Sequence, residues 1–139
     1  MASFDVDSLF TNVPLRETID ICLGSLFVDP SSTIIGLGKT HFRTLIEPAV
    51  LNSFIFIFDG KLYQQTEGLG MGLRLGPTFA NIFLCFKEKL WLDSCPELFK
   101  PILYKRYVDG TFLLFKEVSH AHLFLTYLNS QHSNIKFSI

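Results

Sequence analysis

Two Asp-Gly dipeptides limit most strongly the folds that this chain can adopt. Asp59-Gly60 and Asp109-Gly110 each lie between two short apolar segments. Asp-Gly is a preferred two-residue loop of a tight β-hairpin, because such loops need positive φ angles that Asp and Gly tolerate. The sequence therefore predicts two hairpins, one near 54–65 and one at 102–116. Their strands are expected at 54–58, 61–65, 102–108 and 111–116.

Helices and single strands are predicted around these hairpins. Apolar residues at helical spacing indicate helices, and short apolar segments near both ends of the chain indicate strands. The expected helices cover 14–27, 40–51, 77–93 and 119–129, and the expected strands cover 3–6 and 134–139. Without the 54–65 hairpin, this order is the β-α-β-β-α-β pattern of an α+β, ferredoxin-like fold. No linker or repeat divides the chain, so residues 1–139 are expected to form one domain.

The helix ends and faces can also be predicted. Thr11-Asn12 and Ser119 are expected N-caps, because short polar side chains accept bonds from the first amides of a helix. Pro48 weighs against a helix at 40–51. The stripe of 77–93 that we expect to face the core contains Phe79, Ile82, Phe83, Phe86 and Leu90.

The composition indicates a folded domain without a strong net charge. Hydrophobic residues make up 48% of the 139 residues and the net charge is −1, which excludes disorder and a polybasic nucleic-acid clamp. The 15 Phe residues require a dense core or a face meant for a partner. Three Cys without a C-x-x-C pair exclude a disulfide scaffold and a zinc ribbon, so reduced, intracellular thiols are expected. No apolar segment approaches the ~18 residues of a membrane helix, and there is no signal-peptide pattern.

Two aspartates are candidates for binding a metal ion. The ferredoxin-like arrangement aligns the end of the first strand, at Asp5, with the tip of the second hairpin, at Asp109. Paired carboxylates bind hard cations such as Mg²⁺, and two ions about 3.5–4 Å apart can clamp both oxygens of a phosphoryl transfer. The alternative for Asp109 is an ordinary turn residue, since Asp59-Gly60 needs no metal to explain it.

Four segments around these aspartates match the motifs of a known protein family. The first is 3–14, Ser-Phe-Asp-Val-Asp-Ser-Leu-Phe-Thr-Asn-Val-Pro, and the second consists of 68–72 and 76–83. The third is 106–109, Arg-Tyr-Val-Asp, which continues with a second Asp in the family, and 124–137 match the segment that follows. In this order, and over nearly the whole chain, they resemble the palm motifs of reverse transcriptases, most of all those of Penelope-like retroelements.

The resemblance implies a fold and an activity. The fold is a partial polymerase palm with an extra hairpin near 54–65, truncated at both ends, so that the N-terminal fingers, the thumb and the endonuclease are absent. The activity is RNA-directed DNA synthesis with two Mg²⁺ or Mn²⁺ ions. The implied partners are an RNA template, a DNA primer, a dNTP and the missing fingers and thumb segments. No membrane partner is expected, and the resemblance implies a nuclear location if the chain is a functional retroelement product.

The resemblance also assigns roles to single residues. Asp5 and Asp109 become catalytic metal ligands, and the backbone carbonyl of Val6 becomes a further metal ligand. The implied nucleotide-binding residues are Phe10, Met71 and Gly72, and the implied primer- and template-positioning residues are Tyr107 and Val108. Phe10 would lie under the incoming sugar, and glycine would let backbone approach the templating pair. The alternatives are a core position for Phe10 and a flexible loop for the glycines.

Three departures from the family pattern affect the expected activity. Gly110 replaces the second aspartate of the third motif, Leu73-Arg74 replaces Ser-Pro, and Gly70 replaces an alanine. We expect weak metal binding and an activity that is impaired or lost, which leaves open whether this chain alone is an enzyme. Asp7 is a candidate compensating carboxylate if the first strand extends that far. The alternative for Asp7 is a turn or helix-start residue.

Two other functions stay open. One is a ferredoxin-like module that binds single-stranded nucleic acid through aromatic residues of its sheet, for which 54–58, Phe-Ile-Phe-Ile-Phe, is the candidate segment. The other is a scaffold without chemistry. An apolar segment of that length is more often core, and the RNA-binding aromatic signature of such modules is absent. Metal titration separates polymerase-like function from both alternatives.

Overall fold

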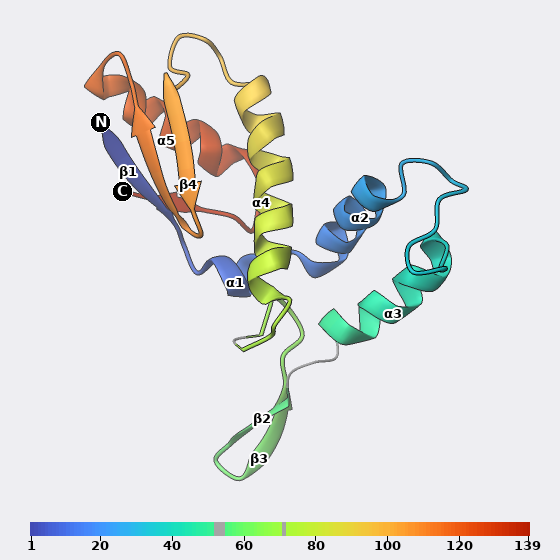
Figure 1. The fold of residues 1–139 in the computed structure, drawn as a ribbon. Coiled ribbons are helices and arrows are strands. Elements are labelled where there is room, and N and C mark those ends of the chain that lie inside the picture. The colour runs from blue at the N-terminus through green and yellow to red at the C-terminus, as the bar shows by residue number, and fades with distance from the viewer. Residues whose placement is uncertain (52–54, 71) are drawn as a thin grey trace.

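The centre of the molecule is a four-stranded antiparallel sheet in the order β4-β5-β1-β6 (Figure 1). The computed structural model describes residues 1–51, 55–70 and 72–139. The strands of the sheet are β1 (Ala2–Val6), β4 (Leu103–Tyr107), β5 (Gly110–Leu114) and β6 (Phe137–Ser138). This order is that of a ferredoxin-like α+β fold, as the sequence predicts. The last strand is shorter than the expected 134–139.

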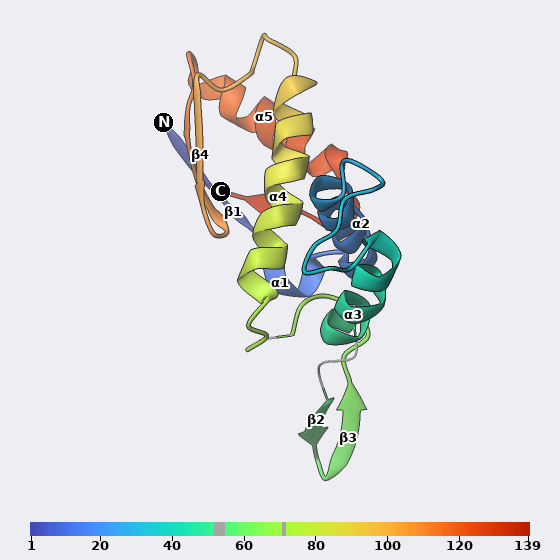
Figure 2. The ribbon, with the colours of Figure 1, turned by 45° about the vertical axis from the view of Figure 1, so that its right-hand side comes forward.

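Strand β1 separates a buried face of the sheet from an open one. Phe4 and Val6 are buried, whereas Asp5 between them is exposed. Figure 2 shows the helices of the body on one side of the sheet. On that side the Phe4 ring stacks on Phe124 with centroids 6.4 Å apart. Because strand side chains alternate, Asp5 lies on the face opposite the described helices.

The predicted helices are present within one or two residues of their expected bounds. They are α2 (Leu15–Leu26), α3 (Lys39–Leu51, with Pro48 inside it), α4 (Gly76–Asp93) and α5 (Val118–Gln131). An unpredicted short helix, α1 (Leu9–Asn12), follows β1. The expected N-caps are therefore wrong. Thr11-Asn12 lie inside α1, and Ser119 lies inside α5.

The buried face of α4 differs from the predicted stripe. Phe79 and Phe83 are buried as expected, but Phe86 is 43% exposed and Leu90 49% exposed. Ala80, Leu84, Glu88 and Trp91 are buried instead. Helix α4 packs against α1 and α2 as well as against the sheet. Its buried residues therefore differ from those predicted from apolar spacing alone. A carboxylate, that of Glu88, therefore lies on the core face.

The first predicted hairpin is confirmed and stands apart from the sheet. It consists of β2 (Ile55–Phe58) and β3 (Lys61–Gln64), and its loop residues Asp59 and Gly60 have φ of 49° and 70°. Phe54, the expected first residue, lies outside the described residues. The hairpin projects from the body in both views (Figures 1 and 2), and all residues of its two strands are exposed.

The second hairpin turns one residue earlier than predicted. Tyr107 pairs with Gly110, so the loop residues are Val108 and Asp109 rather than Asp109-Gly110. Gly110 begins β5, and the positive φ, 57°, belongs to Val108. A one-residue slip would move Thr111 and Leu113 from the buried to the open face. The register of the core therefore overrides the local Asp-Gly preference.

None of the helices in the described part of the chain is long and apolar enough to cross a membrane.

Candidate metal and nucleotide site

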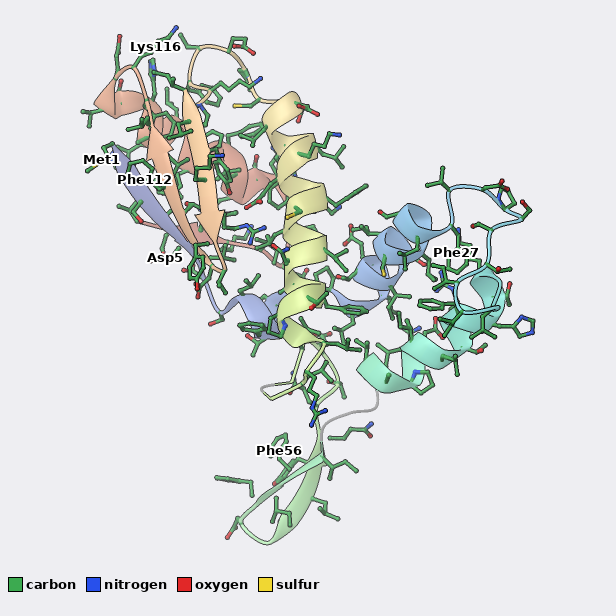
Figure 3. The ribbon with its side chains drawn as sticks, viewed as in Figure 1. Met1, Asp5, Phe27, Phe56, Phe112 and Lys116 are labelled. Atoms are coloured by element: carbon green, nitrogen blue, oxygen red, sulfur yellow. The ribbon has the colours of Figure 1, made fainter. Side chains whose placement is uncertain are left out.

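The structure brings Asp5, Val6 and Asp109 to the same end of the sheet. Asp5 pairs with Gly110 across β1 and β5, and the Val6 N–H donates a 3.0 Å hydrogen bond to the Asp109 carbonyl. Figure 3 shows Asp5 near the turn between β4 and β5. Asp5 and Asp109 are both exposed to solvent. This end of the sheet can offer two carboxylates and backbone carbonyls to a hard cation.

Position 110 faces the carboxylate of Asp5. A Cβ placed on Gly110 would lie 3.3 Å from Asp5 Oδ1 and 3.8 Å from the Tyr107 carbonyl oxygen. An acidic side chain at 110 would therefore share the open face with Asp5. Among the described residues, no three His, Cys, Asp or Glu side chains form a group that could hold a metal ion. The carboxylates present suit a hard cation in kind, but they are few for two ions.

The compensating role predicted for Asp7 requires that the first strand extend to residue 7. Strand β1 ends at Val6. The Asp7 carboxylate accepts a 2.6 Å hydrogen bond from Ser138 Oγ, and the Asp7 N–H donates to the Lys136 carbonyl at 2.8 Å. These bonds hold Asp7 against the C-terminal segment.

Phe10 and Gly72 line one cavity of about 350 Å³. Its other lining residues are Gly70, Leu73, Arg74, Gly76 and Pro77. Phe10 is half-buried. It lies in α1, which follows the end of β1 that carries Asp5. Met71, the third nucleotide-binding residue expected, lies outside the described residues. The cavity thus combines an aromatic side chain, glycine backbone and one arginine.

Gly68 lets the second motif approach the first. The Leu69 N–H donates a 2.6 Å bond to the Phe10 carbonyl. Gly68 has a φ of 71°, and a Cβ there would lie 2.3 Å from the Thr11 carbonyl oxygen. Only glycine accommodates both this φ and this approach. The loop before α4 is therefore fixed against α1 at this point.

Tyr107 and Val108 are accessible beside the site. Tyr107 is 86% exposed and Val108 44% exposed. Phe112 and Lys105 pair across β5 and β4, and Phe112 also pairs with Ser3, so both share the open face with Asp5. Phe112 is 42% exposed. The open face therefore presents aromatic rings and one lysine next to the carboxylates.

A buried polar network behind the turn was not predicted. Glu88 Oε1 accepts hydrogen bonds from the Tyr104 hydroxyl at 2.6 Å and from Arg106 Nε at 2.7 Å. Burial raises the pKa of Glu88, although the bond from Tyr104 and the charge of Arg106 oppose this. The available signal was helical spacing, because Glu88 lies four residues after Leu84 and three before Trp91 in the strongest predicted helix.

Comparison with known proteins yields a structural likeness. No protein-family model matches the chain, and no curated protein matches its sequence. The fold is similar to that of apo telomerase from Candida tropicalis, truncated from its C-terminal domain, with a TM-score of 0.63 and 12% sequence identity. The alignment covers 93% of this chain and 26% of the telomerase chain, so this chain spans about a quarter of that protein's length.

This likeness defines the class of fold. The chain shares the mixed α+β architecture of that structure, with an antiparallel sheet and packed helices, which confirms the predicted α+β fold class. At 12% identity the likeness concerns the fold alone.

Proposed function

We propose that this chain is the palm of a reverse transcriptase, of the Penelope-like kind, with impaired two-metal nucleotidyl transfer. The observation that supports the proposal best is the pairing of Asp5 with Gly110, beside the Asp109 turn. One end of the sheet therefore carries Asp5, Asp109 and, at position 110, a glycine where the resembled motif has its second aspartate. The motif resemblance supports the assignment to Penelope-like elements, and a nuclear location would follow from it.

The roles of the residues follow from this proposal. Asp5, Asp109 and the carbonyl of Val6 would hold divalent cations. Such ions, when bound, activate the attacking hydroxyl and neutralise the leaving pyrophosphate. Phe10 would limit the space beneath the sugar of a dNTP, next to Gly72 in the cavity. Tyr107 and Val108 would contact a DNA primer paired with an RNA template.

Metal titration tests the site directly. We expect Mg²⁺ or Mn²⁺ to bind weakly, with a dissociation constant on the order of millimolar, because few carboxylates are available. Asp5→Asn should abolish the calorimetric signal. Asp59→Asn, at the exposed loop of the β2–β3 hairpin, is the matched control and should leave the signal unchanged. Equal heats for the Asp5→Asn variant and the unmodified protein would overturn the site.

A graft tests the role of position 110. Because catalysis needs both fixed ions and an aligned substrate, we expect no primer extension by this chain alone. Placed between the fingers and thumb of an active relative, it should stay weak until Gly110→Asp is introduced. Gly110 has no positive φ, so the steric demand of the new side chain is a small shift of Asp5, whose Oδ1 lies 3.3 Å from the Cβ position.

The graft has two contrary outcomes. If the graft with Gly110 polymerises as fast as the Gly110→Asp version, the second carboxylate is dispensable. If neither is active, Leu73-Arg74 is the next cause to test, because these residues line the same cavity as Phe10.

A second candidate function is binding of single-stranded nucleic acid. The residues that favour it are Tyr107 and Phe112 on the open sheet face, with Lys105 beside Phe112. In the predicted segment 54–58, residues 55–58 are exposed rather than in the core, but they lie on the separate β2–β3 hairpin and not on this sheet. Bases stack on exposed aromatic rings, and phosphate contacts make binding salt-dependent. RNA binding that is metal-independent, falls with salt and is lost in Phe112→Ala would favour this function over the polymerase palm.

A further inference from the structure

The turn that carries Asp109 has an unfavourable backbone. Val108 has a φ of 57° at the first loop position of a two-residue hairpin. That position normally takes glycine, because a β-branched side chain is crowded at positive φ. The register of the buried strands places Val108 in the turn, and contacts outside the turn must keep this conformation. The side chain of Arg106 makes one such contact.

Arg106 joins the turn to helix α4. Its Nη1 donates a 2.8 Å hydrogen bond to the Val108 carbonyl. Its Nη2 donates to Asn81 Oδ1 at 3.1 Å and to Cys85 Sγ at 3.3 Å, both on α4. The side chain is only 7% exposed. The Arg106 guanidinium therefore bonds to the turn, and its own position is fixed by two bonds to α4.

Glu88 fixes the orientation of this guanidinium. Its side chain is 10% exposed, and it accepts from Arg106 Nε at 2.7 Å. The Tyr104 hydroxyl donates to the same oxygen at 2.6 Å. A buried carboxylate needs such partners, and the planar arginine fork directs its remaining donors toward Val108 and Asn81. A lysine at 106 could not supply bonds in these three directions.

We infer that Arg106 is a positioning residue, which holds the Val108-Asp109 turn in its strained form and so sets Asp109 beside Asp5. This inference rests on the proposed metal site and adds the residue that orients one of its ligands. The Val6 N–H bond to the Asp109 carbonyl fixes one side of the turn, and Arg106 fixes the other. Neighbours that orient a metal ligand typically alter metal affinity by about 10- to 100-fold when removed.

The test compares two variants of the same network. Arg106→Lys removes the fork, whereas Tyr104→Phe removes one bond to Glu88 and leaves the contact with Val108. We expect Arg106→Lys to weaken Mn²⁺ binding about tenfold and to remove the positive-φ signature of Val108 in NMR couplings and NOEs. Tyr104→Phe should lower Tm but keep both signals. A folded Arg106→Lys protein with unchanged Val108 signals and Mn²⁺ affinity would overturn the inference.

If Arg106→Lys does not fold in the original chain, it is tested together with Val108→Gly. Val108→Gly removes the crowding at positive φ, so a turn with glycine depends less on Arg106. In the Val108→Gly background, Arg106→Lys should therefore cost much less than the tenfold loss of Mn²⁺ affinity expected in the original chain. A tenfold loss relative to the Val108→Gly protein would contradict the positioning role. If the unmodified protein binds no Mn²⁺, the proposed metal site fails, and the NMR signals of Val108 still decide the role of Arg106.

Discussion

At the scale of single residues, the glycines of the site are needed for different reasons. Gly68 combines a φ of 71° with a backbone approach to Thr11 that excludes any Cβ. Gly110 has neither feature, and its Cβ position meets only the Asp5 carboxylate and the Tyr107 carbonyl. Gly68 matches the motif that the sequence resembles, whereas Gly110 departs from it. Of the two, only Gly68 is required by the fold, because the backbone at position 110 also permits other residues.

Gly68→Ala is therefore expected to destabilise the protein strongly. The positive φ and the 2.3 Å approach to the Thr11 oxygen should together cost about 2 kcal/mol or more. Denaturant unfolding measures this loss. Gly24→Ala is the control, since Gly24 is an exposed position of helix α2 and nothing lies within 4 Å of a Cβ placed there. This change should stabilise the protein by about 0.5–1 kcal/mol. Equal stability of the Gly68→Ala variant and the unmodified protein would show that the approach of the two motifs is not a constraint.

At the scale of elements, the β2–β3 hairpin differs from every other element by its exposure. Ile57 and Leu62 pair across the two strands and are 72% and 71% exposed. The stacked rings of Phe56 and Tyr63, 5.6 Å apart, lie on the same hairpin, and Phe56 extends into open space in Figure 3. Its strands pair only with each other among the described strands. Such exposed apolar strands favour association.

Replacing this apolar pair should improve solubility without changing stability. We expect Ile57→Thr with Leu62→Lys to leave the free energy of unfolding within about 0.5 kcal/mol, because neither side chain is buried. Concentration-dependent association should fall, as measured by light scattering. Leu98→Lys, at a residue that is 73% exposed elsewhere on the surface, serves as the control and should change association little. A large loss of stability in the double variant would instead mean that the hairpin packs on the body.

At the scale of the whole molecule, one carboxylate joins three segments that are distant in sequence. Glu17 on α2 contacts Lys87 Nζ of α4 at 2.5 Å and His132 Nε2, just after α5, at 3.1 Å. Partial burial raises the pKa of Glu17, but the bonds from Lys87 and His132 outweigh burial and lower it below its ordinary 4.5. The helices that support the sheet are thus tied together by a group that titrates in acid.

The stabilising effect of Glu17 should therefore depend on pH. It is complete above the ordinary Glu pKa of 4.5 and is lost as pH falls through the lowered pKa of the folded state. Since Glu17 is partly exposed, we expect Glu17→Gln to cost about 1 kcal/mol at neutral pH and almost nothing in strong acid. Urea unfolding across this range measures the difference.

The control for this prediction is Glu97→Gln. Glu97 pairs with Lys100 at 3.1 Å, but its side chain is 86% exposed. Its replacement should change stability little at any pH, because solvent screens exposed pairs. A cost of Glu17→Gln that is the same at neutral and acid pH would show that lost packing, rather than charge, explains it.

Much of the fold and part of the candidate site could be predicted from local patterns. Apolar spacing predicts the helices and strands, and their order predicts the ferredoxin-like topology, because each pattern reflects the period of one element. That topology alone predicts that Asp5 and Asp109 lie near each other. The buried face of α4 could not be predicted, since Glu88 is accommodated there only by Tyr104 and Arg106 from another element.

Local patterns along the chain specify which segments become helices and strands, and the order of these elements brings Asp5 and Asp109 to one end of the sheet. Long-range packing specifies the turn at Val108-Asp109, the approach of Gly68 to α1, and the network behind the turn. For the turn, the cause is the burial of Thr111 and Leu113. Keeping these side chains in the core fixes the register of β5, which costs more to shift than an unfavourable φ at Val108 costs to maintain.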